Sequence, residues 1–218
     1  MFRAIFGLSW QWLRGPLCLL SLLGAGIPML GVASSWDAGT PSVDAILASA
    51  NLAGILIAVV AVLAGAIAGD VLWRQDARRG HSYAMSLPVR REVFLRYRAA
   101  SGALLLLLPA FAIFVGIASV GVLRELPPGV NTYAWDTALR SWVAMLLALA
   151  LTLGVRQGLG ARGRRVLLGV GLALTMTLWL EPQLTPGMPR MARVVAALFS
   201  GSYSPFAVIF SPWPLVDL

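Results

Sequence analysis

The sequence predicts an all-α protein, a polytopic bundle of transmembrane helices with five clear spans. Of its 218 residues, 59% are hydrophobic and 12% are charged, whereas about a quarter of the residues in a soluble domain are charged. The apolar residues form blocks separated by short polar stretches, and these blocks match the roughly 17 to 25 residues of a membrane-spanning helix. Runs such as the leucines at 104–108 lack the alternation of a barrel strand, so we expect the spans to be helices.

The amino-terminal segment 1–14 has apolar and polar residues on opposite faces of a helix. Phe6 and Trp10 share one face, whereas Arg3 and Arg14 lie on the other. This pattern predicts an interfacial helix that lies along the membrane surface. A signal peptide also begins with positive charge and an apolar core, but no small-residue cleavage site follows, so we expect the segment to stay in the mature protein.

Five apolar blocks follow, and each is predicted to cross the membrane as a helix. The fifth is short for a full crossing, and Pro109 is expected to kink the third. The predicted spans are residues 16–32, 45–68, 102–123, 138–155 and 166–180.

The carboxyl-terminal segment 181–218 is rich in proline and forms no clear sixth span. Its apolar pieces 194–199 and 206–210 are interrupted by a Gly-Ser-Tyr-Ser-Pro sequence. We expect an outward-facing or re-entrant segment here, within a single transmembrane domain that covers residues 1–218.

The distribution of arginine predicts the orientation. Segments 1–14, 70–98 and 156–165 hold 2, 7 and 4 arginines, and the opposite side holds 4. Under the positive-inside rule, the amino terminus and both Arg-rich connections lie in the cytoplasm. We therefore expect a multi-pass protein of the cytoplasmic (inner) membrane. The net charge of +8 has the same explanation, and we expect no nucleic-acid partner.

Motifs for catalysis and for cofactor binding are missing from the sequence. The chain has no lysine, so it has no Walker A motif and is not itself an ATPase. Its Gly158-x-Gly160-x-x-Gly163 spacing lies between two spans rather than after a strand, which indicates a turn and not a dinucleotide site. His81 and Cys18 are the only residues of their types, so we expect no zinc site, no cofactor and no enzyme activity.

Few polar residues fall within the predicted spans. Asp70 ends the second span, Arg140 begins the fourth, and Asn51 lies inside the second. We interpret these as interface or packing residues and not as a proton relay. Small residues at helical spacing, as in Gly65-x-x-x-Gly69, allow close helix packing within the chain or across a dimer.

The polar connection 70–98 contains the most specific pattern. An acidic residue, Asp76, precedes Gly80-His81, and a Leu87-Pro88-Val89-Arg90-Arg91 turn leads into the third span. A short helix over 73–79 can end at Gly80, and Pro88 favours extended geometry at the residue before it. The connection is therefore expected to be a compact helix and turn.

This pattern resembles the corresponding connection of ABC-2-type (type V exporter-like) ABC transporter permeases. The resemblance implies that the chain is the permease subunit of an exporter and that a separate ATP-binding-cassette ATPase powers it. It also implies a homodimer, or a heterodimer with a second permease, in the lipid bilayer. The residues that it assigns to ATPase coupling are Asp76, Arg78, Arg79, Gly80, His81, Leu87, Pro88, Val89, Arg90 and Arg91.

Other functions remain open at this point. A haem-exporter-like permease of cytochrome c maturation has a similar length and a comparable connection. A non-transporting membrane scaffold or assembly factor would need only the spans. A membrane-embedded enzyme is disfavoured because no acid, base or metal set is present. The spans are compatible with lipids, drugs, polysaccharides or peptides as the transported substrate.

Overall fold

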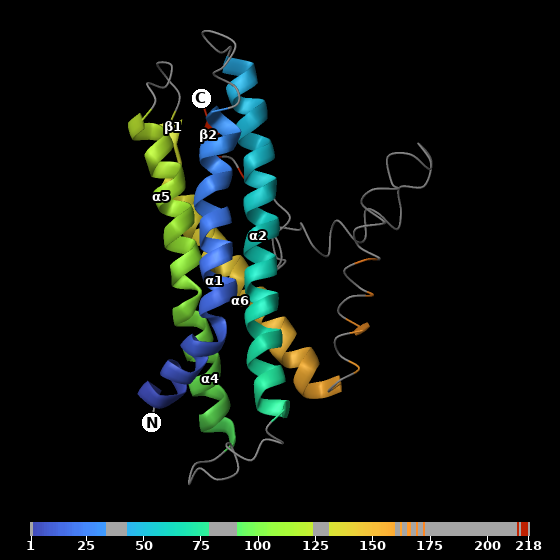
Figure 1. The fold of residues 1–218 in the computed structure, drawn as a ribbon. Helices are drawn as coiled ribbons and strands as arrows, with labels where there is room; N and C mark the ends of the chain where they lie inside the picture. Colours follow the sequence, from blue (N-terminus) through green and yellow to red (C-terminus); the bar gives the residue numbers. More distant parts are fainter. Residues whose placement is uncertain are drawn as a thin grey trace, which may run out of the picture.

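The computed structural model describes a bundle of long helices (Figure 1). It covers residues 2–33, 43–78, 91–123 and 131–159, together with residues 162, 165, 166, 169, 172, 213 and 215–217. The helices are α1 (Phe2–Ala33), α2 (Val43–Arg78), α4 (Arg91–Leu105), α5 (Leu107–Leu123) and α6 (Ala134–Leu159), and two short strands are β1 (Asn131–Thr132) and β2 (Val216–Asp217).

As predicted, the described residues are nearly all helical, and the short strands β1 and β2 are the exception. In this part of the chain, four helical segments are long and apolar enough to span a membrane, and each overlaps one of the first four predicted spans. The segments are Phe2–Gly31, Val43–Arg74, Glu92–Val122 and Ala134–Leu159. The predicted fifth span, 166–180, falls almost entirely outside the described residues, so the number of five remains a prediction.

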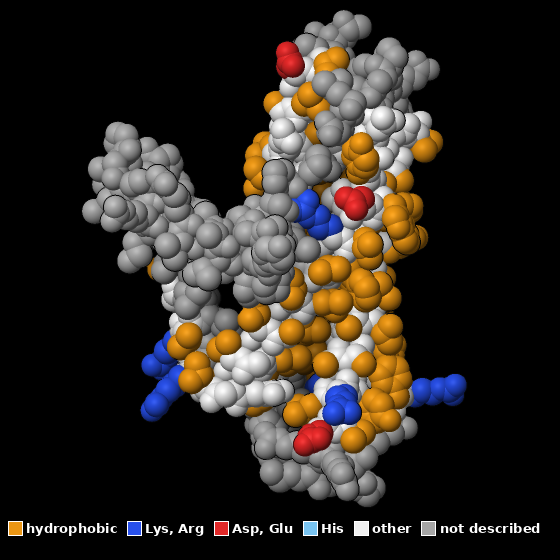
Figure 2. All heavy atoms as spheres, turned by 180° about the vertical axis from the view of Figure 1, so that it is seen from behind, with side chains coloured by type: hydrophobic (Ala, Val, Ile, Leu, Met, Phe, Trp, Pro, Cys, Tyr) orange, Lys and Arg blue, Asp and Glu red, His pale blue; other side chains and the backbone are white. Residues whose placement is uncertain are grey.

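The outer surface of the bundle is strongly apolar. Large side chains such as Leu22 on α1 and Val122 on α5 are 73% and 85% exposed, and hydrophobic side chains cover much of the height of the molecule in Figure 2. Monomeric soluble proteins rarely expose apolar patches larger than a few hundred Å². Such a surface is favourable when it is in contact with lipid instead of water.

The segments 1–14 and 16–32, predicted as an interfacial helix and a separate span, form one continuous helix in the structure. Helix α1 runs for 32 residues and contains Pro16. Its first turns bend away from the axis of the remainder in Figure 1, and proline gives a physical reason for a bend because it removes a helical hydrogen bond. The predicted boundary is therefore a bend and not a break.

Helix α2 also extends beyond its predicted end. It continues for 36 residues through Asp70 to Arg78, so the short separate helix predicted over 73–79 is wrong as a separate element. No glycine or proline lies between 70 and 78, and an Asp70–Arg74 pair one turn apart supports the helical path.

The third long helix begins early and is interrupted where a kink was predicted. It starts at Arg91, so residues 91–98 of the predicted connection are helical. It then changes to a turn at Leu106, between α4 and α5. The cause is Pro109, which has no N–H to donate to the carbonyl of Leu105 and crowds it with its ring. The interruption lies within the third predicted span, three residues before Pro109.

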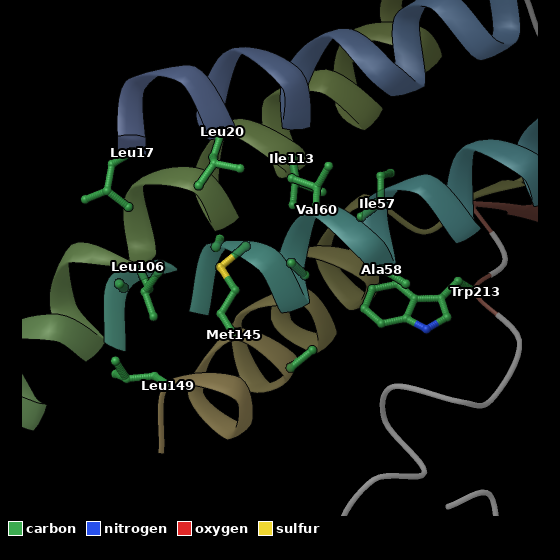
Figure 3. Close-up of a cluster of buried hydrophobic side chains, with 14 of the residues drawn as sticks. Leu17, Leu20, Ile57, Ala58, Val60, Leu106, Ile113, Met145, Leu149 and Trp213 are labelled. Atoms are coloured by element: carbon green, nitrogen blue, oxygen red, sulfur yellow. The ribbon is translucent and has the colours of Figure 1, made fainter. Parts of the chain in front are cut away.

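The core lies where α2 packs against α6 and α1, and where α1 packs against α5. Leu17 and Leu20 of α1, Ile57 and Val60 of α2 and Met145 of α6 belong to one cluster of buried side chains (Figure 3). All five side chains are buried. The bundle therefore has one continuous apolar core.

Glycine allows the closest helix contacts. A methyl group added at Gly65 would overlap the carbonyl oxygen of Met145, and one added at Gly69 would lie 2.8 Å from Cβ of Thr152. Both neighbours belong to α6. The Gly65-x-x-x-Gly69 pattern thus packs α2 against α6 within one chain.

The described part of the carboxyl-terminal segment returns to the bundle. Strand β2 pairs with β1 in an antiparallel register, Asn131 opposite Asp217. Trp213 is buried, and its carbonyl oxygen lies against Gly54, about three turns into α2. This pairing was not predicted from the sequence. It lies at the end of the bundle opposite the amino terminus (Figure 1).

Candidate functional site

The predicted ATPase-coupling residues belong to the carboxyl end of α2, to the amino end of α4 or to the sequence between them. Asp76 and Arg78 belong to the last turn of α2, and Arg91 is the first residue of α4. Arg79, Gly80, His81, Leu87, Pro88, Val89 and Arg90 lie outside the described residues. Both helix ends lie at the same end of the bundle as the amino terminus (Figure 1).

We call this the Arg-rich end. It is formed by the start of α1, the last turns of α2, the first turns of α4 and the last turns of α6. Figure 2 shows the described arginine side chains mainly at this end, next to the band of hydrophobic side chains. Arginines with described side chains in these turns include Arg3, Arg74, Arg96, Arg98 and Arg156.

An ion pair joins α2 to α6 at the Arg-rich end. Oδ1 of Asp70 lies 2.8 Å from Nη2 of Arg156, and Oδ2 contacts Nη2 of Arg74 on the next turn of α2. The Arg156 side chain is 6% exposed and that of Asp70 is 17% exposed, but that of Arg74 is 44% exposed. The interhelical pair is therefore poorly solvated, and its two charges depend on each other far more than an exposed pair does.

A second polar contact joins α4 to α1. Nη1 of the buried Arg98 donates a hydrogen bond to Oγ of Ser9 at 3.0 Å. Its guanidinium carbon lies 4.6 Å from the centre of the Trp12 ring, a cation–π contact. The hydroxyls of Ser9 and Ser101 are 3.1 Å apart. The first turns of α1 and α4 are thus held together by a buried charged group.

Sequence reasoning missed both of these arginines, because it assigned Arg98 and Arg156 to connections between spans. The structure corrects this assignment: both lie in helices with buried side chains. A signal was present in the helical spacing i, i+4, i+7, i+11. The two buried faces that follow this spacing are Phe94, Arg98, Ser101 and Leu105 on α4, and Met145, Leu149, Thr152 and Arg156 on α6.

A groove opens between α4 and α6 at the Arg-rich end. Its volume is about 330 Å³. The residues that line it are Leu95, Arg96, Arg98 and Ala99 of α4 and Ala150, Leu153, Gly154 and Gln157 of α6. Its walls are mainly apolar, with polar groups at positions 96, 98 and 157.

The polar residues of the predicted spans have packing and surface positions. The guanidinium carbon of Arg140 lies 4.6 Å from the centre of the Trp213 ring, so it holds the carboxyl-terminal segment against α6. Asn51 is exposed on the outside of α2. Asp70 forms the interhelical ion pair. The positions of Arg140, Asn51 and Asp70 agree with their interpretation from the sequence as interface and packing residues.

The described residues offer little for catalysis. Among them, no three His, Cys, Asp or Glu side chains lie together in a group that could hold a metal ion. Two polar contacts, Asp70–Arg156 and Arg98–Ser9, link four helices at the Arg-rich end. Comparison with protein-family models, curated proteins and solved structures gives no match.

Proposed function

We propose that this chain is the membrane-embedded permease subunit of an ABC transporter and that a separate ATPase subunit docks at its Arg-rich end. The observation that supports this most directly is the position of the Leu87-Pro88-Val89-Arg90-Arg91 pattern. This pattern leads into α4 in the segment between the ends of α2 and α4, and it resembles the ATPase-docking connection of ABC-2-type permeases.

The packing of α2 and α4 supports a mechanical role for this connection. A displacement of the segment 79–90 would act on both helices at once. Helix α2 is joined to α6 by the Asp70–Arg156 pair and by close contacts at Gly65 and Gly69, while α4 is joined to α1 through Arg98 and Ser9. ATP-driven movement of the partner would then tilt α2 with α6 and α4 with α1, because closely packed elements move as rigid bodies.

The proposed location is the cytoplasmic (inner) membrane, with the amino terminus and the Arg-rich end in the cytoplasm. The excess of arginine at this end supports that orientation through the positive-inside rule. Energy would come from the partner, because a chain without lysine has no Walker A motif. We expect two permease chains in the working transporter, either identical or different, and export as the direction of transport.

We expect the double variant Arg90→Glu/Arg91→Glu to reduce the ATPase activity that co-purifies with the full chain by at least about tenfold. Reversing two charges in a docking segment opposes a complementary surface, and a tenfold loss corresponds to about 1.4 kcal/mol of binding free energy. The measurement is ATP hydrolysis by the tagged chain, isolated from its native membranes after mild crosslinking.

The matched control is Arg162→Glu/Arg165→Glu, which reverses two charges beyond α6 and should keep the co-purifying ATPase. Equal activity with both double variants would contradict the role of the connection. If the unaltered chain brings down no ATP-hydrolysing subunit at all, the chain is a membrane scaffold and not a permease.

A further inference from the structure

We infer that the groove between α4 and α6 binds an anionic phospholipid from the membrane leaflet at the Arg-rich end. The groove volume of about 330 Å³ lies within the range of about 300 to 1,000 Å³ found for small-molecule sites. This inference goes beyond the proposed transport function, because it requires neither an ATPase nor a transported substrate.

The groove has a polar end and an apolar end. Helix α4 starts at the Arg-rich end and α6 finishes there (Figure 1). Arg96 therefore lies nearer this end than Ala99, and Gln157 lies nearer it than Ala150. An amphiphilic molecule fits this arrangement. Its headgroup would lie beside Arg96 and Gln157, and its acyl chain would lie along Ala99 and Ala150.

The charge of the lining favours an anionic headgroup. Two arginines and no acidic residue are among the side chains that line the groove. Arg96 is exposed. The buried Arg98 donates a hydrogen bond to Ser9 and adds a second positive charge to the lining of the groove. Arg pairs well with phosphate oxygens, and a zwitterionic headgroup would also bring an ammonium group into this positive field.

Small residues make the room for an acyl chain. A methyl group added at Gly154 would meet no atom within 4 Å, whereas Leu149, further from the Arg-rich end, lies against Gly102 of α4. The helices are thus in contact deep in the bundle and leave open space nearer the end. Leu95 and Leu153 provide the apolar walls of that space.

Native mass spectrometry of the purified full chain tests this inference, with phosphatidylglycerol and phosphatidylcholine of identical acyl chains as the added lipids. We expect phosphatidylglycerol to bind preferentially. The variant Arg96→Gln should weaken its binding about fivefold, because one arginine near an anionic lipid surface contributes about 1 kcal/mol. Gly154→Leu should fill the groove and weaken the binding of both lipids.

Controls for these variants are available on α1 at the same end of the bundle. Arg14→Gln removes an exposed charge outside the groove, and Gly7→Leu adds a side chain where nothing lies within 4 Å; both should bind lipid as the unaltered chain does. If Gly154→Leu lowers the melting temperature, Ala150→Phe fills the groove from an exposed position instead.

Equal binding of the two lipids would overturn the inference, and so would unchanged phosphatidylglycerol binding by a folded groove-filling variant. It would also be overturned if that variant left lipid binding intact but separated two copies of the chain, because the groove would then hold protein. None of these outcomes depends on the ATPase, so a failure here is distinct from a failure of the proposed function.

Discussion

Replacing Gly65 by alanine is expected to destabilise the helical bundle by about 2 kcal/mol, even though alanine is the better helix former. The helix propensity gained is at most about 1 kcal/mol, and overpacking a tight core typically costs about 1 to 3 kcal/mol. Here the added methyl overlaps the backbone carbonyl of Met145, which cannot rotate away as a side chain would. Helix α6 must shift, and the contacts around Ala148 and Thr152 shift with it.

The control for this prediction is Gly26→Ala on α1, where an added methyl meets nothing within 4 Å. Propensity acts alone at that position, so the variant should be neutral or slightly stabilised. The measurement is the melting temperature of each full-chain variant in the same detergent. Equal melting temperatures for the Gly65 and Gly26 variants would show that α2 and α6 do not pack as described.

Substituting Asp70 by asparagine is expected to cost about 2 to 3 kcal/mol of folding free energy. Removing one partner of a buried ion pair typically costs about 3 to 5 kcal/mol, and the 17% exposure of Asp70 reduces that cost. The buried guanidinium of Arg156 loses its carboxylate, and α2 loses its polar link to α6. Denaturation of the purified full chain measures the change.

Arg74→Gln is the matched control, since Arg74 contacts the same carboxylate from a side chain that is 44% exposed. Exposed pairs contribute about 0 to 1 kcal/mol, so this variant should stay close to the unaltered chain. A double-mutant cycle between Asp70→Asn and Arg156→Gln should give a coupling energy of about 1 to 3 kcal/mol. Additive costs in that cycle, or an equally large effect of Arg74→Gln, would contradict an interhelical role for the pair.

The helices themselves could be predicted because their cause is local in the sequence. Apolar blocks of membrane-spanning length predicted the four long helices, and Pro109 predicted the interruption of the third. The ends were less accurate: α1 and α2 continue through the predicted boundaries at 14–16 and 68–70. Neither helix ends at these positions, and Pro16 bends α1 without ending it.

The partners of the buried charges could not be predicted in the same way. A helical wheel places Arg98 and Arg156 on buried faces, but it does not say which helix lies opposite. Asp70 meets Arg156 because α2 packs against α6, and Arg98 meets Ser9 because α4 packs against α1. Those neighbours are set by the tertiary packing of helices far apart in sequence.

The carboxyl-terminal contacts are long-range for the same reason. The pairing of β1 with β2 joins residues that are more than eighty positions apart, and two-residue strands have no periodic pattern to detect. Of the predicted coupling residues, the structure gives the backbone positions of Asp76, Arg78 and Arg91. The role of these residues stays a prediction.

Cysteine labelling from the two sides of the membrane tests the central claim most directly, which is that the Arg-rich end faces the cytoplasm. In a Cys18→Ser background, single cysteines replace Ser35, His81, Gly129 and Gly160, one in each of the segments that follow α1, α2, α5 and α6. A membrane-impermeant maleimide added to intact cells should label positions 35 and 129, and positions 81 and 160 only after permeabilisation. Labelling of position 81 or 160 in intact cells would contradict the account, because no cytoplasmic ATPase could then reach the connection between α2 and α4.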